Sequence, residues 1–197
     1  MPRKPRQLLD DGYYHLICRG NNRLFLFAVE GGFDKFTSLL RDSKTRYAWR
    51  LSHYCLMSNH LHLLGQIRQG AVLPKLMQFL LFEYSRWYRH QTGYVGHLWQ
   101  GRYKSPLVAA ESYFLECGRY IERNPVRAGI VQHPEDYPWS SHRYYAMGTA
   151  DPLLDDDPFY ASLGPDAATR QQRYREFVSL QGPYDQVVDA ALLEAHF

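Results

Sequence analysis

Residues 49–67, WRLSHYCLMSNHLHLLGQI, contain two runs rich in apolar and aromatic residues, separated by a tight turn around Met57–Asn59. Runs of this length on either side of a turn are typical of a β-hairpin. We therefore predict strands over 49–57 and 59–67. Side chains two apart on a strand point to the same face, so His60 and His62 place two imidazole rings side by side.

The segments around this hairpin extend it to a complete α+β fold. YYHLICR at 13–19 predicts a first strand, and apolar residues at helical spacing predict helices over 32–46 and 73–90. A fourth strand is expected over 102–109, where Pro106 either confines it to an edge or marks a bulge. A helix is expected over 111–124, ended by Pro125. The order matches a ferredoxin-like split β-α-β arrangement, with two helices on one face of an antiparallel sheet and an added helix after it.

Composition indicates one globular domain with an uneven distribution of charge. Of the 197 residues, 45% are hydrophobic and 22% charged. Residues 1–147 carry 20 Lys and Arg against 11 Asp and Glu, whereas residues 148–197 carry 3 against 9. We predict a basic domain over 1–147 and an acidic C-terminal tail over 148–197, with an amphipathic helix over 166–181. No run of about 20 apolar residues and no signal peptide is evident, so we expect a cytoplasmic protein without a membrane partner.

The acidic stretch DPLLDDD at 151–157 allows two interpretations. In the first, it lies over the basic surface of residues 1–147 and competes with a nucleic acid that binds there. In the second, it is a disordered, solubilising appendage.

Chemistry is expected where the histidine strand meets the helix over 111–124. His60 and His62 suit a divalent metal, although a solvent-facing histidine beside a hydrogen-bonded, half-buried one would give the same pattern. Tyr120 and Asn124 share one helix face, so packing against the histidines would add an amide ligand and a phenol nucleophile. With 16 tyrosines in the chain, a simple packing role for Tyr120 is the alternative.

Several motifs together resemble those of the REP-associated tyrosine transposases, a branch of the HUH single-tyrosine transposases. The matching segments span about residues 10–145 and are YHLICRGNNR at 14–23, NHLHLL at 59–64, WQGRYKS at 99–105 and YIERNPVRAGIV at 120–131.

This resemblance implies an enzyme that nicks single-stranded DNA next to a hairpin. His60 and His62 would hold Mg²⁺ or Mn²⁺, and Tyr120 would become joined to the 5′ phosphate. Asn124 stands where the wider class commonly has Gln, which leaves open whether it binds the metal directly or through water. No nucleotide cofactor is expected, and the location would be cytoplasmic, at the nucleoid. A monomer is expected, with a dimer as the alternative.

Basic and polar residues around these motifs are the candidates for contacts with the DNA backbone. Ordinary solvated charges are the alternative for each, and His15 is expected to be a hydrogen-bonded structural residue. The candidate DNA-binding residues are Arg19, Asn22, Arg23, Arg102, Lys104, Arg119, Arg123 and Arg127.

Parts of the sequence are also compatible with three other functions. A histidine-triad nucleotide hydrolase would need a third histidine where Leu64 stands. A non-catalytic repressor that binds DNA hairpins would tolerate loss of the site, yet His60, His62, Tyr120 and Asn124 are all present. An RNA-binding module of related topology would need aromatic pairs on its central strands.

Overall fold

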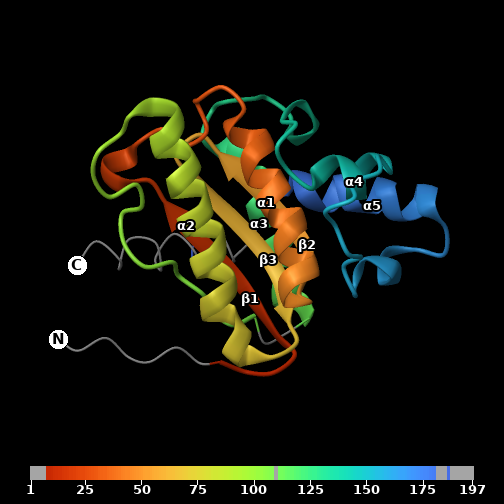
Figure 1. The fold of residues 1–197 in the computed structure, drawn as a ribbon. Coiled ribbons are helices and arrows are strands. Elements are labelled where there is room, and N and C mark those ends of the chain that lie inside the picture. The colour runs from red at the N-terminus through yellow and green to blue at the C-terminus, as the bar shows by residue number, and fades with distance from the viewer. Residues whose placement is uncertain (1–7, 109–110, 181–185, 187–197) are drawn as a thin grey trace.

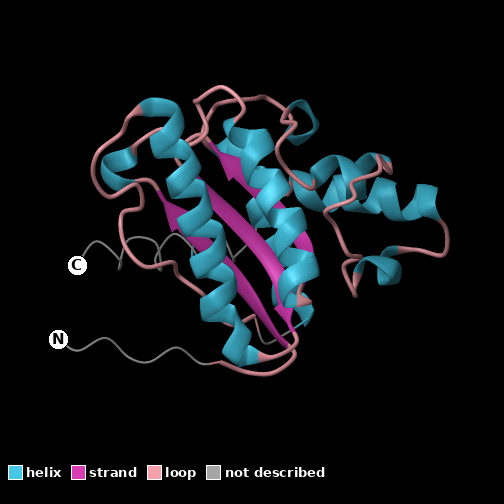
Figure 2. Cartoon of the chain, in the orientation of Figure 1, coloured by secondary structure: helices cyan, strands magenta, loops and turns pink. Residues whose placement is uncertain are grey.

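An antiparallel sheet forms the centre of the computed structural model, which describes residues 8–108, 111–180 and 186 (Figures 1 and 2). Its strands are β1 (Gly12–Arg19), β2 (Arg50–Met57) and β3 (His60–Ile67), in the order β1-β3-β2. The tight turn predicted between β2 and β3 is present, and β3 lies in the middle of the sheet because it pairs with both β1 and β2. This confirms the predicted hairpin, whose pairing shifts register between Leu51 and His53.

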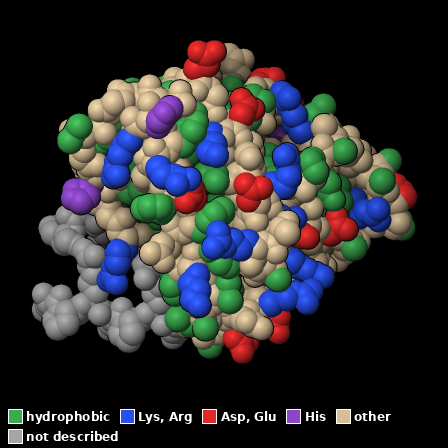
Figure 3. All heavy atoms as spheres, in the orientation of Figure 1, with side chains coloured by type: hydrophobic (Ala, Val, Ile, Leu, Met, Phe, Trp, Pro, Cys, Tyr) green, Lys and Arg blue, Asp and Glu red, His purple; other side chains and the backbone are tan. Residues whose placement is uncertain are grey.

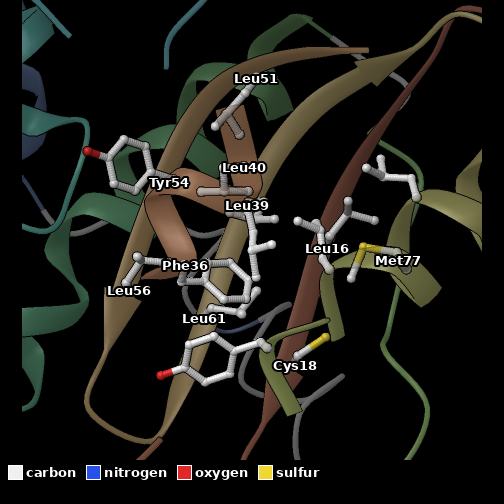
Figure 4. Packing of buried hydrophobic residues seen from close by; sticks show 14 of the residues in the cluster. Leu16, Cys18, Phe36, Leu39, Leu40, Leu51, Tyr54, Leu56, Leu61 and Met77 are labelled. Atoms are coloured by element: carbon white, nitrogen blue, oxygen red, sulfur yellow. The ribbon is translucent and has the colours of Figure 1, made fainter. Parts of the chain in front are cut away.

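Helices α1 (Gly32–Tyr47) and α2 (Leu73–Thr92) cover one face of the sheet (Figure 1). Alternate strand residues such as Leu16, Leu56 and Leu61 meet apolar helix residues such as Phe36 and Met77 in the main core (Figure 4). Burial of such side chains contributes about 1.5–3 kcal/mol each to folding. The predicted α+β fold with two helices on one face is confirmed.

Helix α3 (Glu111–Arg127) packs on the opposite face of the sheet, where it contacts β2 and β3 (Figure 1). Ile17, Cys55 and Leu64 of the strands form a second core with Cys117 and Ile121 of this helix. The added helix therefore covers the sheet face that carries His60 and His62.

The expected fourth strand and the expected end of the helix over 111–124 are both wrong, and a proline is involved in each. Residues 104–108 run antiparallel to β1 but form only isolated bridges, because Pro106 has no N–H to donate, although its carbonyl accepts from the His15 N–H. Helix α3 continues past Pro125 to Arg127 instead of ending at Asn124.

The C-terminal segment packs onto the rest of the protein through α4 (His142–Met147) and α5 (Ala167–Ser179). The second of these lies within the predicted range 166–181. Short 3-10 turns occur at Asn21–Arg23, Gly70–Val72, Pro134–Asp136 and Tyr160–Leu163.

A buried network joins α3 to this segment. The carboxylate of Glu122 accepts hydrogen bonds from the Ser141 and Tyr174 hydroxyls and contacts the Nδ1 atoms of His53 and His142. Nε2 of His53 lies 2.9 Å from Asp157.

The described contacts of the acidic stretch 151–157 contradict a disordered appendage, whereas its competition with nucleic acid stays a prediction. Asp151 accepts a hydrogen bond from Tyr54, Asp155 pairs with Lys44 at 2.7 Å, and Asp157 contacts His53. The stretch is therefore ordered along β2 and α1, and none of these contacts involves the predicted DNA-binding residues.

The surface formed by α1 and α2 carries Lys and Arg side chains interspersed with acidic and apolar ones (Figure 3). Among the described helices, none combines the length and the apolar character needed to cross a bilayer.

Candidate active site

Strand β3 presents His60 and His62 to α3, as their spacing predicts. Their ring centroids lie 5.0 Å apart; His62 is fully buried and His60 is partly buried. In the register with β1, His60 faces Arg19 and His62 faces Ile17. The pair therefore lies at the end of the central strand, beside an arginine of its neighbour.

Helix α3 brings Tyr120 and Asn124 to the same place. The Tyr120 ring lies 5.7 Å from the His62 ring, centroid to centroid, and its residue is 1% exposed. The Arg127 guanidinium lies 4.9 Å above the Tyr120 ring. Asn124 is buried one turn after Tyr120 and lies within hydrogen-bonding reach of His60. The four predicted site residues thus come together from two elements.

One nitrogen of each histidine is occupied by a neighbouring side chain. Nδ1 of His60 lies 2.7 Å from Oδ1 of Asn59, and Nδ1 of His62 lies 2.9 Å from Nε2 of His15. Nε2 of His62 is buried and has no hydrogen-bond partner in the described part of the chain. Both rings can therefore offer Nε2 to a ligand.

Burial keeps these histidines neutral. Desolvation, assisted by Arg19, lowers the pKa of His60 to about 4, and desolvation with the neighbouring rings holds the pKa of His62 well below its usual value. Desolvation also lowers the pKa of His15 to about 3. A neutral imidazole has the lone pair that metal binding requires.

The amide of Asn124 is oriented by the backbone of α3. Its Nδ2 donates to the carbonyl oxygens of Tyr120, at 2.8 Å, and of Ile121, at 3.3 Å. The opposite orientation would place an oxygen against two carbonyl oxygens, so Oδ1 is the atom left for another partner.

These atoms fit a divalent metal. No group of three or more His, Cys, Asp or Glu side chains suited to a metal occurs among the residues that the structure describes, so a metal held by His60 and His62 would take a third protein ligand of another kind, such as the Asn124 amide oxygen. Two imidazole nitrogens and one oxygen suit Mn²⁺ and similar ions, with water completing the coordination. The unpartnered Nε2 of His62 is the observation that favours a ligand there.

The predicted DNA-binding residues differ in their placement. Arg119 is 2% exposed, ion-paired with Glu116 and stacked on Phe177, and Arg123 donates to the carbonyl oxygens that end α5. Because these guanidinium groups are engaged within the protein, we exclude both from the candidate DNA surface. The exposed members of the set are Asn22, Arg23, Arg102 and Arg127, whereas Arg19 and Lys104 are partly buried.

Sequence reasoning missed the roles of His15 and Asn59. His15 is hydrogen-bonded, as expected, but its partner is His62 itself. The alternation of β1 was a usable signal, because His15 and Ile17 share a face and Ile17 pairs with His62. Asn59 could have been noticed as the polar neighbour of His60.

Comparison with known proteins agrees with this architecture. A family model described as "Transposase IS200 like" matches residues 9–124. Among curated proteins, none matches the chain significantly.

Two solved structures are similar to the chain. A REP-associated tyrosine transposase bound to a REP hairpin is 19% identical, covers 80% of this chain and 93% of its own, and has a TM-score of 0.63. A candidate transposase from Deinococcus radiodurans R1 is 23% identical over 68% of this chain and 97% of its own, with a TM-score of 0.41. The first likeness shows a shared fold. Because the family model covers more than half of the 197 residues, the chain belongs to the IS200-like transposase family.

Proposed function

We propose that this protein nicks single-stranded DNA beside a hairpin and retains the 5′ end as a phosphotyrosine on Tyr120. The observation that carries the proposal is the convergence of Tyr120 and Asn124 from α3 with His60 and His62 from β3. Membership of a transposase family makes DNA the expected partner.

The chain's own residues supply the nucleophile and hold the phosphate. In the nicking step, the Tyr120 oxygen forms a bond to phosphorus while the bond to the 3′ oxygen breaks. The phenol loses its proton and the departing 3′ oxygen gains one. Arg127, over the Tyr120 ring, and Arg19, beside His60, would bind the charged phosphate.

His60, His62 and Asn124 would hold a divalent ion through Nε2, Nε2 and Oδ1. A bound metal polarises the phosphate and stabilises the charge that develops on its oxygens. His15 and Asn59 occupy the Nδ1 atoms, so each ring keeps its other nitrogen for this purpose.

The burial of Tyr120 implies a rearrangement before reaction. With the residue only 1% exposed, a phosphate can reach its oxygen only after covering side chains have shifted. We therefore propose that DNA binding opens the surface beside α3. The exposed Asn22, Arg23 and Arg102 would follow the DNA backbone outside this opening.

A covalent-adduct assay tests the proposal. The protein is mixed with Mn²⁺ and labelled single-stranded hairpin oligonucleotides with varied flanks, then analysed by denaturing electrophoresis and intact mass. We expect a protein–DNA adduct with the wild type and none with Tyr120→Phe. Tyr113→Phe is a matched control, because Tyr113 lies on the same helix but is 50% exposed.

The same samples separate the alternatives. Hairpin binding without any adduct would favour the non-catalytic repressor that the sequence also allowed. An adduct that persists in Tyr120→Phe would assign the nucleophile to another residue. Neither binding nor adduct across the set would contradict the proposed function.

A further inference from the structure

Helix α3 contains a proline directly after the candidate ligand Asn124. Pro125 lies inside the helix, which continues to Arg127 and ends with Ala128 donating to the Asn124 carbonyl. A proline has no N–H, so the carbonyl of Ile121, four residues earlier, lacks its usual backbone partner. Within a buried helix such an unpaired carbonyl is costly.

The side chain of Asn124 takes the place of the missing donor. Nδ2 lies 3.3 Å from the Ile121 oxygen and 2.8 Å from the Tyr120 oxygen, and Asn124 is 8% exposed. Asparagine has one donor group and one acceptor atom at the end of its side chain. Once the donor is bound to the helix, the acceptor Oδ1 is directed away from these carbonyls.

We infer that Pro125 is a positioning residue for the metal site: by leaving the Ile121 carbonyl unpaired, it ties Nδ2 of Asn124 to the helix and so presents Oδ1 as the ligand. The inference rests on the proposed metal site. Pro125 thereby gives the short Asn124 side chain a fixed orientation that a regular helix would not impose. It also explains why a residue unfavourable to helices lies next to the site.

The substitution Pro125→Ala separates this role from a structural one. It restores a backbone N–H to the Ile121 carbonyl and removes a helix-breaking residue, so resistance to urea should rise. The Asn124 amide loses one of its two anchors, and the affinity for Mn²⁺ alone should fall by on the order of tenfold. If Pro125 only supported the fold, its substitution would change the stability and the metal affinity in the same direction.

Isothermal titration with Mn²⁺ and urea unfolding measure the two quantities on the full chain. Pro74→Ala is the matched control, since Pro74 lies in the first turn of α2. At that position a proline removes no hydrogen bond to a carbonyl of the helix. We expect its Mn²⁺ affinity to equal that of the wild type. Equal or tighter Mn²⁺ binding by Pro125→Ala would overturn the inference.

A double-mutant cycle on the metal-free protein provides a second, independent test. Asn124→Ala leaves the Ile121 carbonyl without a donor in the wild-type background, but not in the Pro125→Ala background. Asn124→Ala should therefore lower the urea midpoint clearly more in the first background. Equal effects in both would overturn the inference even if Mn²⁺ affinity changes.

The wild type distinguishes this inference from the proposed function. Mn²⁺ binding and a Tyr120 adduct in the wild type, with no effect of Pro125→Ala, would refute the positioning role alone. Absence of Mn²⁺ binding by the wild type would refute the metal site and the inference with it.

Discussion

At the scale of single residues, each proposed ligand is held by its non-ligating atom. Asn59 contacts Nδ1 of His60, His15 contacts Nδ1 of His62, and backbone carbonyls hold Nδ2 of Asn124. Such outer contacts orient ligands and commonly alter metal affinity by 10- to 100-fold, or about 1.4–2.8 kcal/mol.

His15 should therefore influence a metal that it does not bind. His15→Leu removes the acceptor for the Nδ1 proton of His62 and should weaken Mn²⁺ binding by about 10- to 100-fold. His15→Gln places an acceptor near the position of Nε2 and should recover much of this loss. Calorimetric titration gives the affinities, and imidazole ¹⁵N shifts report the tautomer of His62.

His97 provides the control for this pair of substitutions, because His97→Gln changes an exposed histidine, whereas His15 and His62 are buried. If His15→Leu bound Mn²⁺ as tightly as the wild type, or if the wild-type His62 carried its proton on Nε2, the assigned hydrogen bond would be incorrect.

At the scale of elements, the site depends on how closely α3 approaches the sheet. Gly118 lies at a close approach of α3 to β2, since a Cβ atom there would lie 2.8 Å from atoms of the His53 ring. Both partners are buried, so neither can move aside without shifting the helix or the strand.

Gly118→Ala should push α3 away from β2. We expect a loss of about 1–3 kcal/mol in the free energy of unfolding, despite the better helix propensity of alanine. Adduct formation should fall as well, because Tyr120 and Asn124 move with the helix. Urea unfolding and the adduct assay measure the two effects.

Gly101→Ala is the matched control for stability, since no atom beyond its chain neighbours lies within 4 Å of a Cβ built at that position. A Gly118→Ala protein as stable and as active as the wild type would show that α3 and β2 can accommodate a methyl group at this contact.

The elements also show what sequence patterns predict well. The periodicities around Phe36, Leu61 and Met77 located α1, β3 and α2 because each element buries one regular stripe of side chains. The end of α3 was misplaced because local proline preference was offset by a side-chain donor, Asn124, that periodicity does not reveal. The expected fourth strand failed as a continuous ladder for a related reason, the missing N–H of Pro106.

At the scale of the whole molecule, the buried carboxylate of Glu122 links the helix of the nucleophile to the C-terminal segment. Hydrogen bonds from His142 and His53 overcome desolvation and lower the pKa of Glu122 to about 2. Bonds to Asp157 and Glu122 likewise overcome desolvation and raise the pKa of His53 to about 9.

These shifts predict a stability maximum near pH 6.5 for the metal-free protein. Above that pH, unfolded His53 loses its proton while the folded residue keeps it until about pH 9, so unfolding becomes easier. Below it, unfolded histidines gain protons while His15 and His60, with pKa values of about 3 and 4, stay neutral, so stability falls again. We call the two sides of this maximum the acidic and alkaline limbs. Along each limb the free energy of unfolding should fall by on the order of 2–3 kcal/mol.

Urea unfolding between pH 5 and pH 9 measures both limbs. His53→Gln should flatten the alkaline limb and leave the acidic one, whereas His15→Gln should reduce the acidic slope. A free energy of unfolding that stays level between pH 6.5 and pH 9 would contradict the assigned charge state of His53.

The sequence by itself determined the hairpin, the two helices behind it and the histidine pair, because these follow from alternation and periodicity within short segments. It also identified Tyr120 and Asn124 as partners on one helix face. Only the tertiary structure decided that α3 covers the histidine face, that His15 supports His62 and that Arg119 and Arg123 are engaged internally. Those contacts join residues far apart in the chain, and the balance between a charge's desolvation and its new partners depends on packing that no local pattern encodes.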